Sequence, residues 1–152
     1  MTDAVGAAAV WVVHCDGSAV PNPGRMGLGA VLVAPDGTRH TLSRATHSTG
    51  CNNEAELRAL MAAIDESLLL GATALVIHSD NSILVEQLGD ADSKPVARLA
   101  PLFDEARRRI ALLDNVRLVW IPGHRNGEAD ALARAALGMP ARALRPAKQR
   151  RR

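Results

Sequence analysis

Four acidic residues that lie far apart in the sequence have the chemistry of one divalent-metal site: Asp16, Glu56, Asp80 and Asp130. Asp16 and Asp80 each follow an apolar run of strand length, whereas Glu56 and Asp130 lie near the start of predicted helices. Carboxylates a few ångströms apart repel one another, so that one of them keeps a proton unless a cation compensates the charge. Magnesium favours sparse carboxylates together with water and phosphate oxygens, and the pattern therefore indicates metal-assisted phosphodiester chemistry.

Two predicted strands explain how Asp16 and Asp80 could meet. Residues 10–18 (VWVVHCDGS) and 74–80 (ALVIHSD) are largely apolar on both faces, which is typical of central strands of a sheet. If these strands are parallel neighbours, their carboxyl ends lie at the same edge of the sheet, where open α/β sheets bind ligands. We therefore expect Asp16 at the end of its strand and close to Asp80.

The remaining segments predict an α/β domain. The predicted strands are residues 10–18, 27–34, 39–44, 74–80 and 116–121, and the predicted helices are residues 53–70, 82–88, 101–113 and 128–137. We expect Asn52 or Asn53 to cap the first helix and Gly71 to end it. The order βββ-α-β-α-α-β-α indicates a five-stranded mixed sheet flanked by helices.

The composition is that of an ordinary globular domain, with 152 residues of which 47% are hydrophobic and 22% charged. The longest apolar run near the start, residues 4–13, is too short to span a membrane and follows an acidic residue, so we predict neither a membrane span nor a signal peptide. Cys15 and Cys51 lack the spacing of zinc ligands and are expected to be reduced thiols. We expect a cytoplasmic monomer with no membrane partner.

The end of the chain is strongly basic and contains no acid: Arg142, Arg145, Lys148, Arg150, Arg151 and Arg152. Removing these six positive charges from the net charge of +2 leaves the first 140 residues at −4, which two bound divalent ions would neutralise. We therefore expect one domain in residues 1–140 and a basic tail in residues 141–152. Two interpretations of the tail stay open: a disordered, solvated end, or a source of salt-sensitive attraction to phosphates.

Four motifs, in this order, resemble those of type 1 ribonuclease H: DGSAVPNPGRMGLGAVL from Asp16, NNEAEL from Asn52, HSDN from His78 and PGHRNGEADALA from Pro122. Each motif alone is weakly specific, but together, in order and at sensible spacings, they are a strong signal, and the match runs over about residues 11–137. The resemblance implies a ribonuclease H-like fold. It also implies hydrolysis of the RNA strand of RNA/DNA hybrids, with 5′-phosphate and 3′-hydroxyl products.

The resemblance also implies a mechanism. The four acids would bind two Mg²⁺ ions, or Mn²⁺ in their place, of which one activates a water molecule and the other stabilises the leaving 3′ oxygen. His124 matches the family's loop histidine, which moves a proton or helps to release product. Helical periodicity leaves Glu54 and Glu56 as rival ligands, but the family motif places its ligand directly before the position of Leu57, which favours Glu56.

Substrate contacts are implied for Gly17, Asn22, Asn52 and Asn53, which match family positions near the minor groove of the hybrid. There the 2′-hydroxyl groups distinguish RNA from DNA. The alternative for the asparagines is turn and cap chemistry.

Two departures from the family pattern concern binding of the DNA strand. Only residues 89–100 (GDADSKPVARLA) stand where some members carry a longer basic extension. Cys51 and Ser82 stand where Thr and Gln are common in some members.

Two other functions remain possible on the same fold: a non-catalytic nucleic-acid-binding module, and a nuclease that acts on DNA. The complete set of acids argues against the first. The Asn52–Asn53 pair and the loop that contains His124 favour ribonuclease H over the second.

Overall fold

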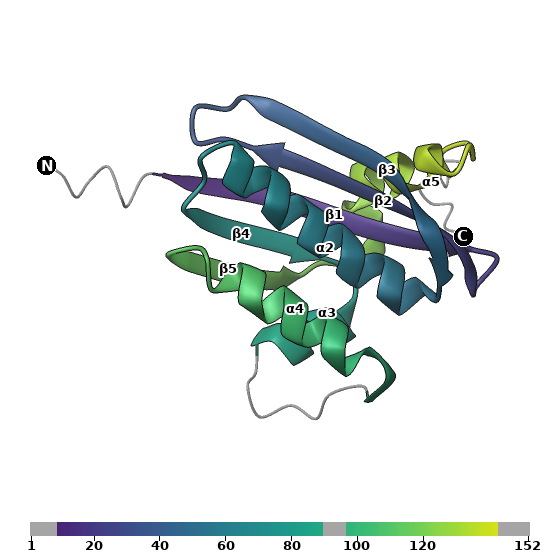
Figure 1. Cartoon of the computed structure of the whole chain (residues 1–152). Coiled ribbons are helices and arrows are strands. Elements are labelled where there is room, and N and C mark those ends of the chain that lie inside the picture. Colours follow the sequence, from purple (N-terminus) through teal and green to yellow (C-terminus); the bar gives the residue numbers. More distant parts are fainter. Residues whose placement is uncertain (1–8, 90–96, 143–152) are drawn as a thin grey trace, which may run out of the picture.

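The computed structural model describes residues 9–89 and 97–142 of the chain. In this part, a five-stranded sheet has the strand order β3-β2-β1-β4-β5 (Figure 1). The strands are β1 (Val10–Val20), β2 (Gly24–Val33), β3 (Arg39–Gly50), β4 (Ala74–Ser79) and β5 (Asn115–Trp120). Strands β1, β2 and β3 pair antiparallel, whereas β4 is parallel to both β1 and β5. The predicted mixed sheet is confirmed.

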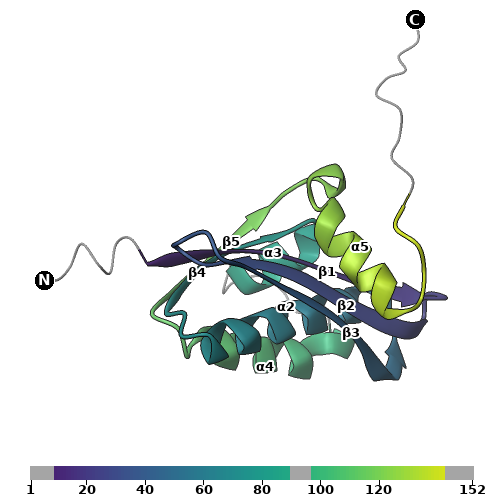
Figure 2. The same ribbon diagram turned by 90° about the horizontal axis from the view of Figure 1, so that it is seen from above.

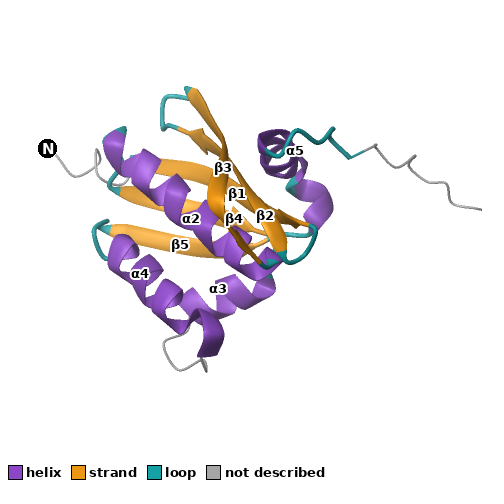
Figure 3. Ribbon diagram, turned by 45° about the vertical axis from the view of Figure 1, so that its right-hand side comes forward, coloured by secondary structure: helices purple, strands orange, loops and turns teal. Residues whose placement is uncertain are grey.

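Helices cover both faces of the sheet. They are α2 (Asn52–Leu69), α3 (Ser82–Gly89), α4 (Ala100–Ile110) and α5 (Gly127–Ala136), with 3-10 turns η1 (Ala97–Leu99) and η2 (Gly123–Arg125). Helices α2 and α4 lie on one face and α5 lies on the other (Figures 2 and 3). Among the described helices, none is long and apolar enough to cross a lipid bilayer.

The main core lies between the sheet and helices α2 and α4. Its largest fully buried apolar side chains include Leu32, Leu57, Leu60, Ile64, Leu75, Ile77, Leu84 and Phe103. The buried leucine and isoleucine side chains of α2 recur at the helical spacing from which this helix was predicted. Burial of each such side chain stabilises the fold by about 1.5–3 kcal/mol before the loss of conformational entropy is counted. The core therefore fixes the position of α2 on β1, β2 and the neighbouring helix.

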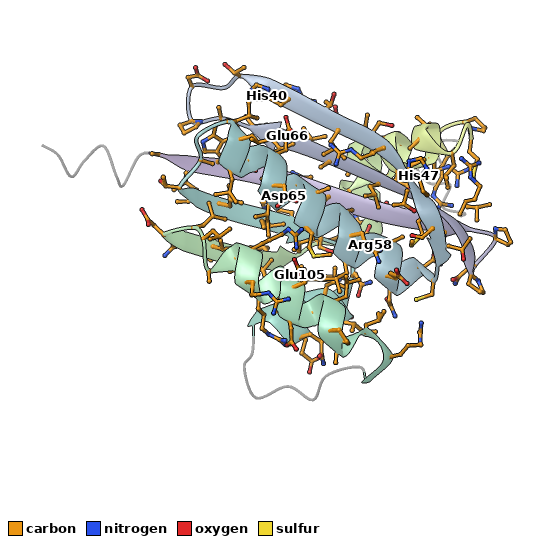
Figure 4. All side chains as sticks on the ribbon, in the orientation of Figure 1. His40, His47, Arg58, Asp65, Glu66 and Glu105 are labelled. Carbon is orange, nitrogen blue, oxygen red and sulfur yellow. The ribbon has the colours of Figure 1, made fainter. Side chains whose placement is uncertain are left out.

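A seam of charged side chains joins α2 to α4 at the surface. Arg109 donates to Asp65 and to Glu105, each at 2.8 Å, and Figure 4 shows these two acids on α2 and α4. These ion pairs are partly exposed and contribute little individually. On the outer strand β3, His47 is exposed, whereas the ring of His40 is half-buried and stacks on Trp11.

Three strands, β1, β2 and β3, are longer than predicted, and β2 begins already at Gly24. Strand β1 continues to Val20, so Asp16 lies inside its strand, opposite Gly29 of β2. The parallel pairing of β1 with β4 nevertheless stops at His14, which leaves Asp16 just beyond that pairing. Strand β3 extends to Gly50 because its backbone pairing with β2 continues there. The sequence did not indicate this extension, because apolar and polar residues do not alternate in this edge strand. The prediction that Asp16 lies at the end of its strand is therefore wrong for the pairing of β1 with β2, which continues to Val20. It holds for the pairing of β1 with β4, which ends before Asp16.

Cys51, rather than Asn52 or Asn53, caps α2. Its Sγ accepts a hydrogen bond from the backbone N–H of Glu54 at 3.4 Å. The prediction of an asparagine cap is wrong because both asparagines lie inside the first turn, where their side chains bond to other segments. The predicted end of the helix is confirmed, since Gly71 follows it with φ +93°.

Helix α5 lies against the backbone of β2. A Cβ atom on Gly29 would lie 2.5 Å from the backbone nitrogen of Ala133 and would overlap the carbonyl group of Ala129. Only glycine permits this close approach. Because α5 also carries Asp130, Gly29 sets how near this acid lies to the sheet.

We expect the Gly29→Ala substitution to lower the free energy of unfolding by about 1–3 kcal/mol, because α5 must move away from β2. Urea denaturation would measure this change. Gly89→Ala is the matched control, since a Cβ atom there meets no atom of the described residues within 4 Å. Equal midpoints for Gly29→Ala and the unaltered protein would contradict the close packing of α5.

Candidate metal centre

Three carboxylates meet at the edge of the sheet where β1 and β4 diverge. Asp16, Glu56 and Asp80 each offer an oxygen, and these oxygens all lie within 4.8 Å of one another. Asp16 comes from β1, Glu56 from the start of α2, and Asp80 from the residue after β4. The parallel pairing of β1 with β4 brings the two aspartates together, and the packing of α2 on β1 adds the glutamate.

Gly17 allows Glu56 to reach Asp16. A Cβ atom on Gly17 would lie 2.5 Å from the backbone nitrogen of Glu56 and would overlap the carbonyl group of Ala55. The backbone of Gly17 lies close enough to oppose, in part, the rise in the pKa of Glu56 that burial and the charge of Asp16 cause. Gly17 is buried beneath α2. It therefore supports the acid group, by which we mean Asp16, Glu56 and Asp80.

Burial and mutual repulsion make these acids reluctant to ionise. Burial, opposed by a hydrogen bond with Glu56 and reinforced by the charges of Asp80 and Asp130, raises the pKa of Asp16 to about 8. Burial and the charge of Asp16 raise the pKa of Glu56 to about 11. Burial also raises the pKa of Asp80, although a hydrogen bond from Asn126 opposes it. Without a cation, the group therefore retains protons at neutral pH.

The acid group fits a divalent cation. Its donors are hard carboxylate oxygens, which suit Mg²⁺ and similar ions. Glu56 Oε1 is buried and has no hydrogen-bond partner among the described residues, although a buried carboxylate oxygen is ordinarily satisfied. A bound cation would provide that partner and would take the place of the retained protons.

Asp130 lies at the rim of the acid group. A hydrogen bond and the charge of this residue contribute to the raised pKa of Asp16, but its oxygens fall outside the group of three. Its Oδ2 instead accepts a hydrogen bond from Arg142 Nε at 3.0 Å. All four predicted acids thus lie at one edge of the sheet, three of them in close contact.

Glu54, the rival of Glu56, faces away from the group. Its carboxylate pairs with Arg58 at 2.8 Å, one turn further along α2. This arrangement is an ordinary i,i+4 ion pair on a helix surface. The structure therefore brings Glu56, and not Glu54, to Asp16.

Asn126 holds Asp80 in place, which the sequence analysis missed. The side chain is buried, and its Nδ2 donates to Asp80 Oδ2 at 3.3 Å and to the carbonyl oxygen of Cys15 at 2.9 Å. An asparagine directly before a predicted helix was a visible capping signal. Nothing in the sequence indicated that this side chain would bridge β1 and the residue after β4.

The three predicted substrate-binding asparagines form a network. Asn22 Oδ1 accepts from the backbone N–H of Asn52 at 3.0 Å, and Asn52 Oδ1 accepts from that of Ala19 at 2.9 Å. Asn53 Oδ1 accepts from Asn81 Nδ2 at 2.8 Å. The network ties the β1–β2 turn to the starts of α2 and α3. Within residues 9–89 and 97–142, the exposed amide nitrogens of Asn22 and Asn52 donate no hydrogen bond.

His124 lies in η2, beside the acid group but not in contact with it. Its side chain is exposed and forms no hydrogen bond with any other described residue. The preceding residue passes close to Asp80, since a Cβ atom on Gly123 would lie 3.9 Å from Asp80 Oδ2. His14 and His78, two residues before the strand acids, stack on each other with ring centroids 4.4 Å apart.

Comparison with known proteins identifies the family. The family described as Reverse transcriptase-like matches residues 14–136. A ribonuclease H of Roseobacter denitrificans is 34% identical over 146 residues, which cover 82% of this chain and 93% of the relative. The chain belongs to the ribonuclease H family. It spans about a third (35%) of the length of the mycobacterial relatives that it also matches.

Solved ribonuclease H structures share the fold. The ribonuclease H1 of the halophilic archaeon Halobacterium salinarum superposes with a TM-score of 0.79 at 28% identity, covering 85% of this chain and 98% of that one. LC11-RNase H1, solved in complex with an RNA/DNA hybrid, gives 0.76 at 25% identity, covering 84% and 96%. The predicted ribonuclease H fold is confirmed. The family depends on divalent metal ions, and the acid group of this member has the donors for one.

The acid group should make the metal-free protein sensitive to pH. Folded Asp16 holds its proton up to about pH 8, whereas the unfolded chain releases it near 3.8, so stability falls as the pH rises between these values. In EDTA at pH 8, we expect Asp16→Asn to raise the free energy of unfolding by about 1–3 kcal/mol. Below pH 3, the two proteins should be equally stable.

Urea denaturation across this pH range would measure the effect, with Asp114→Asn as the control at an exposed site. An Asp16→Asn protein that is less stable than the unaltered chain at pH 8 would show that the acids do not repel one another in the folded state.

Proposed function

We propose that this chain is a metal-dependent endonuclease that hydrolyses the RNA strand of RNA/DNA hybrids and leaves 5′-phosphate and 3′-hydroxyl ends. The observation that carries the proposal is the group of Asp16, Glu56 and Asp80, with the buried, unpartnered Oε1 of Glu56. Membership of the ribonuclease H family supports the reaction, and the hybrid bound to LC11-RNase H1 supports the substrate.

The proposed metal ligands are Asp16, Glu56, Asp80 and Asp130, and the proposed metal is two Mg²⁺ ions, for which Mn²⁺ can substitute. The chemistry that two such ions supply is activation of water and stabilisation of the leaving 3′ oxygen. Two divalent charges also match the net charge of −4 on the first 140 residues. Metal binding and the approach of a polyanion are therefore coupled.

The chain's own residues position the acids and move protons. Asn126 fixes the orientation of Asp80, and the close packing of α2 on Gly17 fixes the position of Glu56. Asp16 and Glu56 would hold the cation as carboxylates, with the protons that they otherwise retain released to solvent. The exposed imidazole of His124 is the proposed group that exchanges a proton with solvent or product.

The hybrid is recognised through its minor groove. Asn22 and Asn52 keep their amide nitrogens available because their carbonyl oxygens are held by backbone N–H groups. These amides can donate to 2′-hydroxyl groups and to base acceptors. Asn53 is half-buried and Gly17 is buried, so their proposed contribution is to hold the turn and helix that present the exposed amides.

The remaining parts of the proposal concern the whole protein. It acts as a monomer with one domain in residues 1–140, and residues 141–152 are a basic tail, of which positions 143–152 lie outside the described residues. A cytoplasmic location is supported by the free thiols of Cys15 and Cys51, since reduced cysteines are usual there. The segment that replaces the family's basic extension also lies largely outside the described residues.

Cleavage of labelled nucleic acids tests the function directly. We expect the full chain to cut an RNA/DNA hybrid in Mg²⁺ or Mn²⁺, to stop in EDTA, and to leave duplex DNA and duplex RNA intact. Binding of the hybrid without cleavage would instead indicate a non-catalytic module. Cleavage of duplex DNA would indicate a DNA-directed nuclease.

A matched pair of variants tests the assignment of the helix ligand. Glu56→Gln should lower hybrid cleavage by at least about 10³-fold, because a lost metal ligand removes several kcal/mol of transition-state stabilisation. Glu54→Gln removes the same charge two residues away and loses only the pair with Arg58, so its activity should stay within about threefold. Equal losses in the two variants would refute the assignment.

A further inference from the structure

The chain turns back toward the metal centre after α5. The helix ends at Ala136, and Gly138 reverses the chain direction with φ +75°. The N–H of Met139 then donates to the carbonyl oxygen of Arg134, and Arg134 Nε donates to that of Pro140 at 2.9 Å. Figure 2 shows this segment running back beside α5. The next residues therefore approach the first turn of α5, which holds Asp130.

The reversal places the positively charged side chain of Arg142 against Asp130. Arg142 Nε donates to Asp130 Oδ2 at 3.0 Å, with side-chain exposures of 65% for the arginine and 16% for the aspartate. Burial raises the pKa of Asp80, and the positive charge of Arg142 is one of the effects that oppose this rise, so its field reaches the acid group. Among the acids Asp16, Glu56, Asp80 and Asp130, only Asp130 forms an ion pair with a described residue.

We propose that Arg142 is a resident counter-cation of the metal centre, which holds Asp130 in the metal-free protein and leaves it when a divalent ion binds. This inference rests on the proposed function, because Asp130 must be a metal ligand. Both cations require the same carboxylate, and the charges of the guanidinium group and the metal ion repel each other. Arg142 therefore weakens metal binding and raises the metal concentration at which the enzyme works.

The way in which Arg142 is held distinguishes this contact from an ordinary surface pair. A long exposed side chain loses conformational entropy when it forms an ion pair, which removes most of the benefit. Here the bond from Arg134 to Pro140 has already fixed the segment two residues before Arg142. The backbone at Arg142 therefore has less entropy to lose when the pair forms, and the pair competes better with a bound ion.

Calorimetric titration of the full chain with Mn²⁺, at fixed pH and ionic strength, tests the inference. Arg142→Ala should bind Mn²⁺ about two- to fivefold more tightly than the unaltered protein. Arg117→Ala is the control, since Arg117 is exposed on β5 and forms no ion pair with another described residue. Its affinity should stay that of the unaltered protein, which shows that loss of any one positive charge is not sufficient.

A double-mutant cycle shows whether Arg142 acts through Asp130. In the Asp130→Asn protein, most of the gain from Arg142→Ala should disappear. A gain of full size in that protein, or equal or weaker Mn²⁺ binding by Arg142→Ala itself, would overturn the inference while metal binding by the unaltered chain still supports the proposed function. If the unaltered chain binds no divalent ion, both fail together.

Discussion

Carboxylates that share a buried site oppose their own ionisation, and this repulsion governs the arrangement of the protein around the ends of β1 and β4. Asp16 and Glu56 have pKa values of about 8 and about 11, so that without a cation they keep protons that exposed acids would have lost. Such a cluster destabilises the folded chain at neutral pH unless positive charge enters it. The fold therefore holds a site that binding of a divalent cation would stabilise, and the same charges couple that cation to an anionic substrate.

Close backbone packing is what assembles the cluster. Gly17 lets α2 lie directly on β1, and Gly29 lets α5 lie directly on β2. Glu56 on α2 and Asp130 on α5 therefore approach the site from opposite faces of the sheet. Asn126 then orients Asp80 through a hydrogen bond, and the packing of α2 on Gly17 positions Glu56. These supports are rigid elements and buried donors, which keep the carboxylates close together despite their repulsion.

Much of the fold could be predicted because its strands and helices carry strong local patterns. The central strands around Val13 and Ile77 are continuous apolar runs, and α2 repeats its apolar residues at the helical spacing. The ends of the elements were less predictable. Strand β3 continues through polar residues because β2 offers it backbone partners, and Cys51 caps α2 because the neighbouring asparagines bond elsewhere. In both cases the backbone partners come from a remote segment, and local composition does not show them.

The sequence alone determined the order of the elements, the family motifs and the meeting of Asp16 with Asp80, because the ends of two parallel buried strands must lie at one edge of a sheet. Helical periodicity did not separate Glu56 from Glu54. Packing did, since only Glu56 lies where α2 crosses Gly17. The bridge from Asn126 and the ion pair between Arg142 and Asp130 were decided by tertiary structure alone. Each depends on where a loop or a chain reversal places a side chain in space, and such distances are set by the packing of whole elements rather than by the residues next to it in sequence.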